Sequence, residues 1–290
     1  MDLKPKYTHH YPPFTQGRYF EEYFSEFWNK SPKNGFLFID IYWCAVFHAA
    51  GNPALVIPML KGYVYEKCKE AWHTGKIPFT VCQWDDGIMF EKPPNLIVFS
   101  MGQSKDIPLP LISEDVTRRL ETTPRLSYED RNVLCSFIGS DTFHVRRKMM
   151  EAFEGRENVI IRMKTWDYRV DVPDAELFVT MTQRSKFGLA PRGYGPSSFR
   201  FFEIIKLGVI PVYIHDGDDA RPFQDILDYD AFSISVHYNE LDTLYDRLNG
   251  ISKETYMKML AELEKVRLWF TMEGTCEYIL KRLCTMPQSS

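Results

Sequence analysis

The sequence lacks a strong charge of either sign and lacks closely paired cysteines. Its formal net charge is −4 over 290 residues, whereas a protein that coats nucleic acid needs a basic face to neutralise phosphate groups. The six cysteines are scattered, so their spacing excludes a zinc knuckle and a thioredoxin-type redox site. We therefore expect no nucleic-acid partner, and we expect free thiols in a reducing compartment.

Long apolar runs are also missing. The most apolar stretch, residues 35–60, is interrupted by Asp40, His48 and Pro53, so it cannot supply the roughly 20 apolar residues of a membrane-spanning helix. The first residues contain no apolar segment of signal-peptide length. We therefore expect a soluble, cytoplasmic protein with no integral membrane segment.

The composition nevertheless provides for a large core, because 44% of the residues are apolar and 15% are aromatic. From residue 133 onwards, short apolar segments alternate with helical patterns, which predicts parallel βαβ units. The polar stretch 113–132 precedes this region and predicts a domain boundary. We expect one domain in residues 1–125 and a second in residues 126–254, with a helix in residues 255–285 packing back on the first.

The stretch PRGYGPSS, residues 191–198, lies between a predicted strand and a predicted helix. In a doubly wound domain, ligands bind beyond the carboxyl ends of the strands, where such loops enter helices. Gly193 and Gly195 allow the backbone to approach a ligand, and Ser197 or Ser198 can cap the helix. Because a helix N-terminus attracts anions, the loop predicts a phosphate site. A structural strand-to-helix turn is the alternative.

Two arginines add positive charge to this loop. Arg192 and Arg200 lie close to it in the sequence, and a guanidinium binds phosphate oxygens in bidentate geometry. The loop is not a Walker loop, since no Gly-Lys-Ser/Thr follows, and it lacks the Gly-x-Gly-x-x-Gly order of a dinucleotide fold. These absences disfavour an unrelated phosphate-binding enzyme.

At these residues the sequence resembles the exostosin-like family of glycosyltransferases. The family pattern has a strand that ends in Pro-Arg-Gly, a variable loop, Ser-x-Arg-x-x-Glu, and then a glycine and a Pro-Val strand. The matching residues are Pro191, Arg192, Gly193, Ser198, Arg200, Glu203, Gly208, Pro211 and Val212. The segment 137–153 is similar to the family's Phe-x-Gly strand and arginine-bearing helix, and the resemblance is specific over about residues 134–245.

The resemblance implies a GT-B-like α/β fold, in which two Rossmann-like doubly wound domains face a central cleft. It implies that the C-terminal domain holds a UDP-sugar donor and that transfer to a glycan acceptor is inverting, without a metal or another cofactor. Family members use several donors, among which we expect xylose. We expect addition of a single sugar.

The resemblance also assigns residues to the donor. It implies that Glu203 contacts the ribose hydroxyls and that arginines neutralise the diphosphate. We assign Arg147, with Arg146 as its neighbour and substitute, to the diphosphate together with Arg192 and Arg200. A solvated helix face is the alternative for Arg146 and Arg147, and an exposed helical carboxylate is the alternative for Glu203.

An inverting transfer needs a general base that takes the proton of the acceptor hydroxyl. The segment TVCQWDDGI ends a predicted strand in Asp85 and Asp86, and only one of two adjacent side chains is expected to face the cleft. We favour Asp86 and keep Asp85 as a candidate. A turn is the alternative role for both, and Asp40 is then the next candidate base.

Three residues near the N-terminus are candidates for the acceptor site. Asp40, Tyr42 and Trp43 lie together in an apolar segment, and aromatic faces stack on sugar rings. The alternative is that these aromatics belong to the core.

One motif suggests a metal, but we predict no metal site. Residues 228–230 have the Asp-x-Asp shape, yet they lie in a segment that the family pattern treats as structural. Two rival functions remain at this stage. One is a catalytically silent UDP- or glycan-binding module of the same fold, and the other is a metal-dependent transferase.

Overall fold

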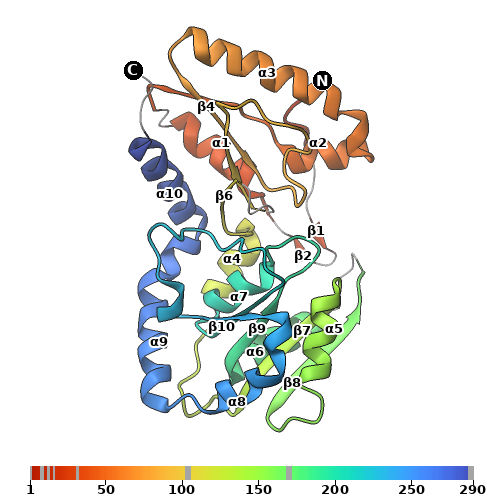
Figure 1. Cartoon of the computed structure of the whole chain (residues 1–290), viewed down its shortest axis with the longest axis vertical. Helices are drawn as coiled ribbons and strands as arrows, with labels where there is room; N and C mark the ends of the chain where they lie inside the picture. The colour runs from red at the N-terminus through yellow and green to blue at the C-terminus, as the bar shows by residue number, and fades with distance from the viewer. Residues whose placement is uncertain are drawn as a thin grey trace.

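Two parallel sheets organise the chain, one in each half. The computed structural model describes residues 2–6, 10–11, 14–15, 17–30, 33–101, 106–167 and 172–286. Figure 1 shows the N-terminal sheet and its helices above, and the C-terminal sheet with its helices below. A short antiparallel pair, β1 (His10–Tyr11) and β2 (Phe14–Thr15), precedes both sheets in the sequence.

The N-terminal half contains a four-stranded parallel sheet in the order β3-β4-β5-β6. Its strands are β3 (Phe36–Phe38), β4 (Ile77–Cys82), β5 (Ile97–Ser100) and β6 (Ile107–Pro108). Its helices are α1 (Phe20–Lys30), α2 (Trp43–Ala50), η1 (Pro53–Leu55), α3 (Ile57–His73) and α4 (Glu114–Glu121).

Helices cover both faces of this sheet, because successive side chains of a strand point to opposite faces. On β4, Phe79 packs in the same apolar cluster as Phe24 of α1. Cys82 lies in a different cluster, with Trp43 of α2 and Leu60 of α3. The sheet is therefore sandwiched between α1 on one face and α2 with α3 on the other.

The C-terminal half contains a five-stranded parallel sheet in the order β11-β10-β9-β7-β8. Its strands are β7 (Val133–Asp141), β8 (Val159–Thr165), β9 (Ser185–Pro191), β10 (Ile210–His215) and β11 (Ile234–His237). Its first helices are α5 (His144–Ala152), α6 (Val172–Arg184) and α7 (Phe199–Lys206). The later helices are η2 (Tyr229–Ala231), η3 (Tyr238–Thr243), α8 (Leu244–Asn249), α9 (Lys253–Val266), η4 (Arg267–Phe270) and α10 (Met272–Thr285).

This sheet is also covered on both faces. Val212 of β10 belongs to the cluster that contains Val145 of α5 and Leu244 of α8. The next residue, Tyr213, belongs to the cluster that contains Phe201 of α7, and their ring centroids lie 5.6 Å apart. The predicted doubly wound α/β architecture with two Rossmann-like sheets is confirmed.

The strand order places a topological switch point between β7 and β9. The first strand, β7, pairs with β8 on one side and with β9 on the other. The chain after β7 and the chain after β9 therefore leave towards opposite sides of the sheet, and such a crevice is the usual ligand site of an open α/β sheet.

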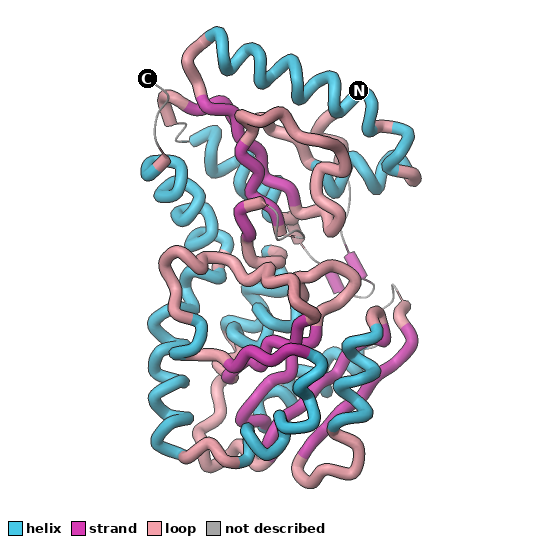
Figure 2. The backbone as a smooth tube through the Cα atoms, in the orientation of Figure 1, coloured by secondary structure: helices cyan, strands magenta, loops and turns pink. Residues whose placement is uncertain are grey.

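The last helices connect the two halves. Helix α9 packs along the C-terminal half, and α10 then runs upward beside α1 (Figures 1 and 2). Here the hydroxyl group of Tyr23 donates a hydrogen bond of 2.6 Å to Glu273. Lys206 of α7 likewise donates to Glu121 of α4 at 2.7 Å.

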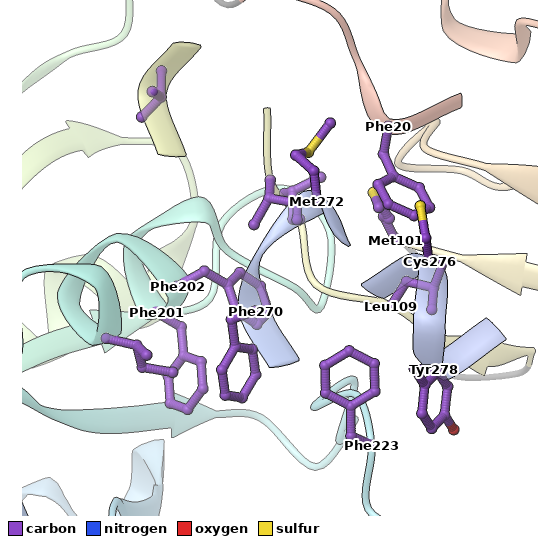
Figure 3. Close-up of a cluster of buried hydrophobic side chains, with 14 of the residues drawn as sticks. Phe20, Met101, Leu109, Phe201, Phe202, Phe223, Phe270, Met272, Cys276 and Tyr278 are labelled. Atoms are coloured by element: carbon purple, nitrogen blue, oxygen red, sulfur yellow. The ribbon is translucent and has the colours of Figure 1, made fainter. Parts of the chain in front are cut away.

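A single apolar cluster crosses from one half to the other (Figure 3). Phe20, Met101 and Leu109 come from the N-terminal half, whereas Phe201 and Phe202 come from α7 in the C-terminal half. Between them lie side chains from η4 and α10 and from the loop after β10. Those labelled in Figure 3 are Phe223, Phe270, Met272, Cys276 and Tyr278.

Five of the cysteines are buried as free thiols, and Cys284 is exposed. None of the described helices is long and apolar enough to span a membrane. The apolar segment 36–43 forms a strand only as far as Phe38, and Trp43 begins α2. The polar stretch 113–132, in which we expected a domain boundary, contains α4.

Candidate active site

A pocket of about 370 Å³ opens at the switch point of the C-terminal sheet. Its C-terminal wall includes Gly139 and Ser140 at the end of β7, the loop from Gly193 to Ser198 after β9, and the first turn of α7. The N-terminal half provides the opposite wall, which consists of Asp85, Leu111, Val116 and Arg119. Both halves therefore face one pocket.

Arg146 is fixed against the floor of this pocket. Its guanidinium donates from Nη1 to the carbonyl oxygen of Ser140 at 2.7 Å and from Nε to that of Arg192 at 3.2 Å. Burial lowers the pKa of Arg146 to about 10, so the side chain stays charged at neutral pH. A Cβ atom on Gly193 would lie 3.2 Å from Nη2 of Arg146. The glycine therefore lets the loop pass directly over the guanidinium.

The N-terminus of α7 also faces the pocket, through Ser197, Ser198 and Phe199. Ser198 occupies the N-cap position with an extended backbone, and within this described segment its hydroxyl accepts no hydrogen bond from the helix. Ser198 therefore has the predicted N-cap position but not the side-chain hydrogen bond of a cap. Amide groups of the first turn that lack a side-chain cap remain available for an anion, which the helix dipole also attracts.

Arg200 and Glu203 form a pair one turn apart on α7. Nη1 of Arg200 donates to Oε2 of Glu203 at 2.6 Å, and Nη2 donates to the carbonyl oxygen of Ile138 at 2.7 Å. The guanidinium lies 3.5 Å from the ring centroid of Phe178, and burial lowers its pKa. Arg200 thus orients Glu203, and both line the pocket.

Of the two adjacent carboxylates, Asp85 lines the pocket. The pair lies in a turn after β4 that is closed by a 2.9 Å hydrogen bond from the Gly87 amide to the Trp84 carbonyl oxygen. Asp85 remains accessible to solvent, but the protein around it raises the pKa of its carboxyl to about 6, and the charge of Asp86 adds to the rise. A carboxylate with this pKa is suited to accept a proton near neutral pH.

Asp86 lies outside the pocket and close to Tyr194 of the glycine-rich loop. The charge of Asp86 is the largest cause of the raised pKa of Tyr194, and a hydrogen bond to Asp86 raises it further. Tyr194 is 64% exposed and lines the pocket. The loop of the C-terminal half thus meets the carboxylate turn of the N-terminal half at this tyrosine.

Two of the arginines assigned to the diphosphate lie outside the pocket. Arg147 is exposed on α5 and donates from Nη1 to both carboxylate oxygens of Asp141 at 2.9 Å. Arg192 is buried behind the loop, where it donates to both oxygens of Asp216 at 2.7 and 2.6 Å and to the carbonyl oxygen of Tyr194 at 3.0 Å. Arg192 thus fixes the loop from behind, and Arg146 takes the place that we had given first to Arg147.

The three candidate acceptor residues also lie outside the pocket. Trp43 is completely buried, and its indole N–H donates to Oγ1 of Thr80 at 3.0 Å. The core alternative therefore applies to Trp43, because the ring has no exposed face for a sugar. Tyr42 is half-buried, and its ring centroid lies 5.4 Å from Nζ of Lys4.

Asp40 is part of a separate, shallow hollow in the N-terminal half. It accepts a hydrogen bond of 2.7 Å from Ser25 and pairs with Lys4. The hollow is lined by Asp40, Leu37, Tyr63 and other residues of the same half. Asp40 therefore has local structural partners and lies outside the pocket at the switch point.

The Asp-x-Asp motif forms a local turn. The carboxylate of Asp228 accepts a hydrogen bond of 3.1 Å from the amide of Asp230 at the start of η2. Within the described ranges, no three His, Cys, Asp or Glu side chains come together in a group that could hold a metal ion.

The sequence reasoning missed several pocket residues. They are Arg119, Arg162, Lys164, Trp166, Asp174 and Tyr194. A signal for three of them lies in their spacing, because residues 162, 164 and 166 alternate along β8 and the residue directly after it and therefore share one face. Arg119 could not be found in this way, since it lies on a helix that the sequence reasoning did not predict.

Two parallel α/β units that face a common pocket form a GT-B-like fold. The exostosin GT47 domain matches residues 81–251, which is more than half of the chain. The chain therefore belongs to the exostosin GT47 family. The matched region contains the carboxylate turn, the switch point and the glycine-rich loop.

Individual relatives are similar over parts of their length. A probable glycosyltransferase of Arabidopsis thaliana is 29% identical over 172 residues, which are 59% of this chain and 32% of that protein. A probable arabinosyltransferase from the same plant is 29% identical over 156 residues, which are 51% of this chain and 34% of that protein. The matches thus span about a third of these relatives. An apo structure of OtsA aligns with 91% of this chain and 70% of its own chain, at 10% identity and a TM-score of 0.43.

Proposed function

We propose that this protein is an inverting glycosyltransferase that moves one sugar from a UDP-sugar to a hydroxyl group of a glycan. One observation carries the proposal. Arg146, the N-terminus of α7 and Asp85 surround a single pocket at the switch point of the C-terminal sheet. Membership in the exostosin GT47 family supports the same reaction class.

In this proposal the C-terminal wall binds the nucleotide. The guanidinium of Arg146 and the amide groups at the start of α7 stabilise the diphosphate, on which negative charge develops as it leaves. Glu203, oriented by Arg200, accepts hydrogen bonds from the ribose hydroxyls. Arg200 adds positive charge nearby but is partly neutralised by Glu203.

The N-terminal wall supplies the base. The acceptor oxygen attacks the anomeric carbon from the side opposite the diphosphate, and the bond between that carbon and the phosphate oxygen breaks. Asp85 takes the proton of the acceptor hydroxyl, and UDP leaves with the bonding electron pair. The raised pKa of Asp85 matches this role, since a base with a pKa near the working pH is both ionised and proton-accepting.

For the donor sugar we propose a pentose. One relative is named as a probable arabinosyltransferase, and xylose is the pentose that we expected from the family resemblance. Xylose and arabinose differ in the orientation of a hydroxyl group, so one or two hydrogen bonds in the pocket decide between them.

The test combines binding and turnover in one panel. Thermal unfolding is measured with UDP and with UDP-xylose, UDP-arabinose, UDP-galactose and UDP-glucuronate, and UDP release is followed in the presence of EDTA. A ligand at about 100 times its dissociation constant should stabilise the fold by about 2.7 kcal/mol. Glu203→Ala serves as the binding control and should weaken UDP at least tenfold, or about 1.4 kcal/mol.

The outcomes separate the rival functions. Stabilisation by UDP and release from a UDP-pentose, both insensitive to EDTA, would support the proposal. Release that EDTA abolishes would indicate a metal-dependent transferase. Stabilisation without turnover of any sugar, even with glycan acceptors added, would indicate a silent binding module. Absence of stabilisation by every uridine nucleotide would refute the donor assignment.

A further inference from the structure

One wall of the pocket is formed by alternate residues of β8 and of the segment directly after it. Arg162, Lys164 and Trp166 all line the pocket, whereas Ile161 and Met163 pack into the apolar cluster on the other face of the sheet. This alternation follows from the two-residue period of a strand. Trp166 lies directly beyond the carboxyl end of β8, which is the side on which ligands bind in such sheets.

The two cations of this wall are already committed to a carboxylate. Asp174, at the start of α6, pairs with Nη2 of Arg162 and with Nζ of Lys164, in both cases at 3.0 Å. Asp174 is only 9% exposed, and burial strengthens such pairs. Asp167, next to Trp166, also lines the pocket, so the two cations of this wall are balanced by two carboxylates, and the wall is less suited to a diphosphate than the floor around Arg146.

The aromatic ring that this wall offers to a ligand is that of Trp166. Trp166 is 57% exposed, although an indole is one of the largest apolar surfaces a protein can bury. Phe178, which also lines the pocket, is 7% exposed and lies beneath the guanidinium of Arg200. An exposed indole at the edge of a polar pocket marks a binding surface for a flat or apolar group.

We propose that Trp166 stacks on the nucleobase of the donor nucleotide. This inference rests on the proposed function, which assigns the diphosphate to Arg146 and the ribose to Glu203. Glu203 and Phe178 line the pocket together with Asp174 and Trp166. In this assignment the nucleotide extends from the diphosphate floor past Glu203, and its base lies against the β8 wall. Stacking is available to every base, because each presents a flat π-face.

The experiment compares Trp166→Ala and Trp166→Phe with Trp72→Ala. Trp72 is a matched control, because it is 76% exposed and lies on α3, outside the pocket. Dissociation constants are measured by calorimetry for UDP, and for inorganic pyrophosphate as the ligand without a base. The thermal midpoint of each variant shows that it is folded.

We expect Trp166→Ala to weaken UDP roughly tenfold, since base stacking is lost, and to leave pyrophosphate within twofold. Trp166→Phe should recover most of the affinity, and Trp72→Ala should behave as the wild type. Uridine should also quench part of the indole fluorescence of the wild type, and this part should be missing in Trp166→Phe.

Other results would overturn the assignment. Equal affinity of wild type and Trp166→Ala for UDP would show that Trp166 does not stack on the base. An equal loss for UDP and pyrophosphate would place Trp166 at the diphosphate, and an effect confined to the KM of the acceptor would place it at the acceptor. If wild type fails to bind UDP, ADP and GDP, the proposed function fails and this inference fails with it.

Discussion

On the C-terminal wall of the pocket, Arg146 and Arg200 each donate a hydrogen bond to a backbone carbonyl group of β7. On the N-terminal wall, Asp85 lies in an exposed turn after β4. The cations are thus fixed before a ligand arrives, whereas the carboxylate depends on a turn for its position. Preorganised charge favours binding of the nucleotide and stabilises the leaving group. The residues of a turn, by contrast, can vary without disturbing the sheet.

This difference separates two kinds of effect. Changes on the C-terminal wall should alter the affinity for the nucleotide, and changes on the N-terminal wall should alter turnover or acceptor use. Adjacent pairs of residues offer controls on both walls, because Arg146 and Arg147, like Asp85 and Asp86, differ in whether they line the pocket.

The largest effect is expected from Asp85→Asn. Loss of a general base lowers kcat by roughly 10²- to 10⁴-fold, while the dissociation constant of UDP should stay within about twofold, since a turnover effect leaves ground-state binding intact. Steady-state kinetics and calorimetry on the same preparation measure both quantities. Asp86→Asn is the control and should retain most of the rate. A larger loss of kcat in Asp86→Asn than in Asp85→Asn would identify Asp86 as the base.

The next effect concerns the neighbouring arginines. Arg146→Met should raise the dissociation constant of UDP about 10- to 100-fold, because a hydrogen bond to a charged group contributes about 1.5–3 kcal/mol. Arg147→Met should change it less than twofold, because Arg147 is exposed and paired with Asp141. Arg146 also bonds to two carbonyl groups, so the thermal midpoint must be measured beside the affinity. Equal losses of UDP affinity in Arg146→Met and Arg147→Met would contradict the distinction between the two arginines.

The pH dependence of kcat/KM should reveal Asp85. The base must be ionised, and partial desolvation by the surrounding protein, together with the charge of Asp86, raises the pKa of Asp85 to about 6. The rate should therefore be constant above about pH 7 and should fall about tenfold per unit well below pH 6. Asp86→Asn removes a charge that contributes to the raised pKa, so its profile should break at lower pH. If kcat/KM begins to fall at the same pH in Asp86→Asn as in the wild type, another group titrates.

The smallest effect is expected at Tyr194, where the two walls meet. Tyr194→Ala should raise the KM of the acceptor about two- to tenfold, because an aromatic contact contributes about 0.5–1.5 kcal/mol. The affinity for UDP should change little, since the loop is held from behind by Arg192. Tyr42→Ala is the control and should leave the acceptor KM unchanged. A rise of the acceptor KM in Tyr42→Ala but not in Tyr194→Ala would indicate that the acceptor binds at the hollow near Asp40.

The sequence predicted the regular C-terminal sheet and the glycine-rich loop, because strands and helices there alternate and the loop falls between two of them. Glu203 and Arg200 were found through a local motif. Local patterns of this kind persist in the fold because the residues are neighbours on one helix. The same reasoning could not rank Arg146 above Arg147, since the choice depends on which side of α5 packs against β7.

The functional residues of the N-terminal half were harder to predict. Trp43 was a candidate because an aromatic ring can stack on a sugar, but tertiary packing buries it against Thr80. The sequence pointed to the pair and favoured Asp86, whereas Asp85 lines the pocket, because the segment alone does not determine the direction of its turn. Arg119 lies on α4, whose few apolar positions are buried in the cluster that also contains residues of α7, a contact that the local sequence does not reveal.

The contact between α10 and α1 joins residues that are far apart in the chain, since Tyr23 and Glu273 are separated by 250 positions. During synthesis the N-terminal half emerges first, but Phe20 and its neighbours lie in the same cluster as Met272 and Cys276. Contacts at such sequence separation form slowly, because a long loop must close before they can contribute. The core of the first half is therefore completed only after the ribosome has released α10. Until then the half made first exposes apolar surface, which is a condition that chaperones recognise.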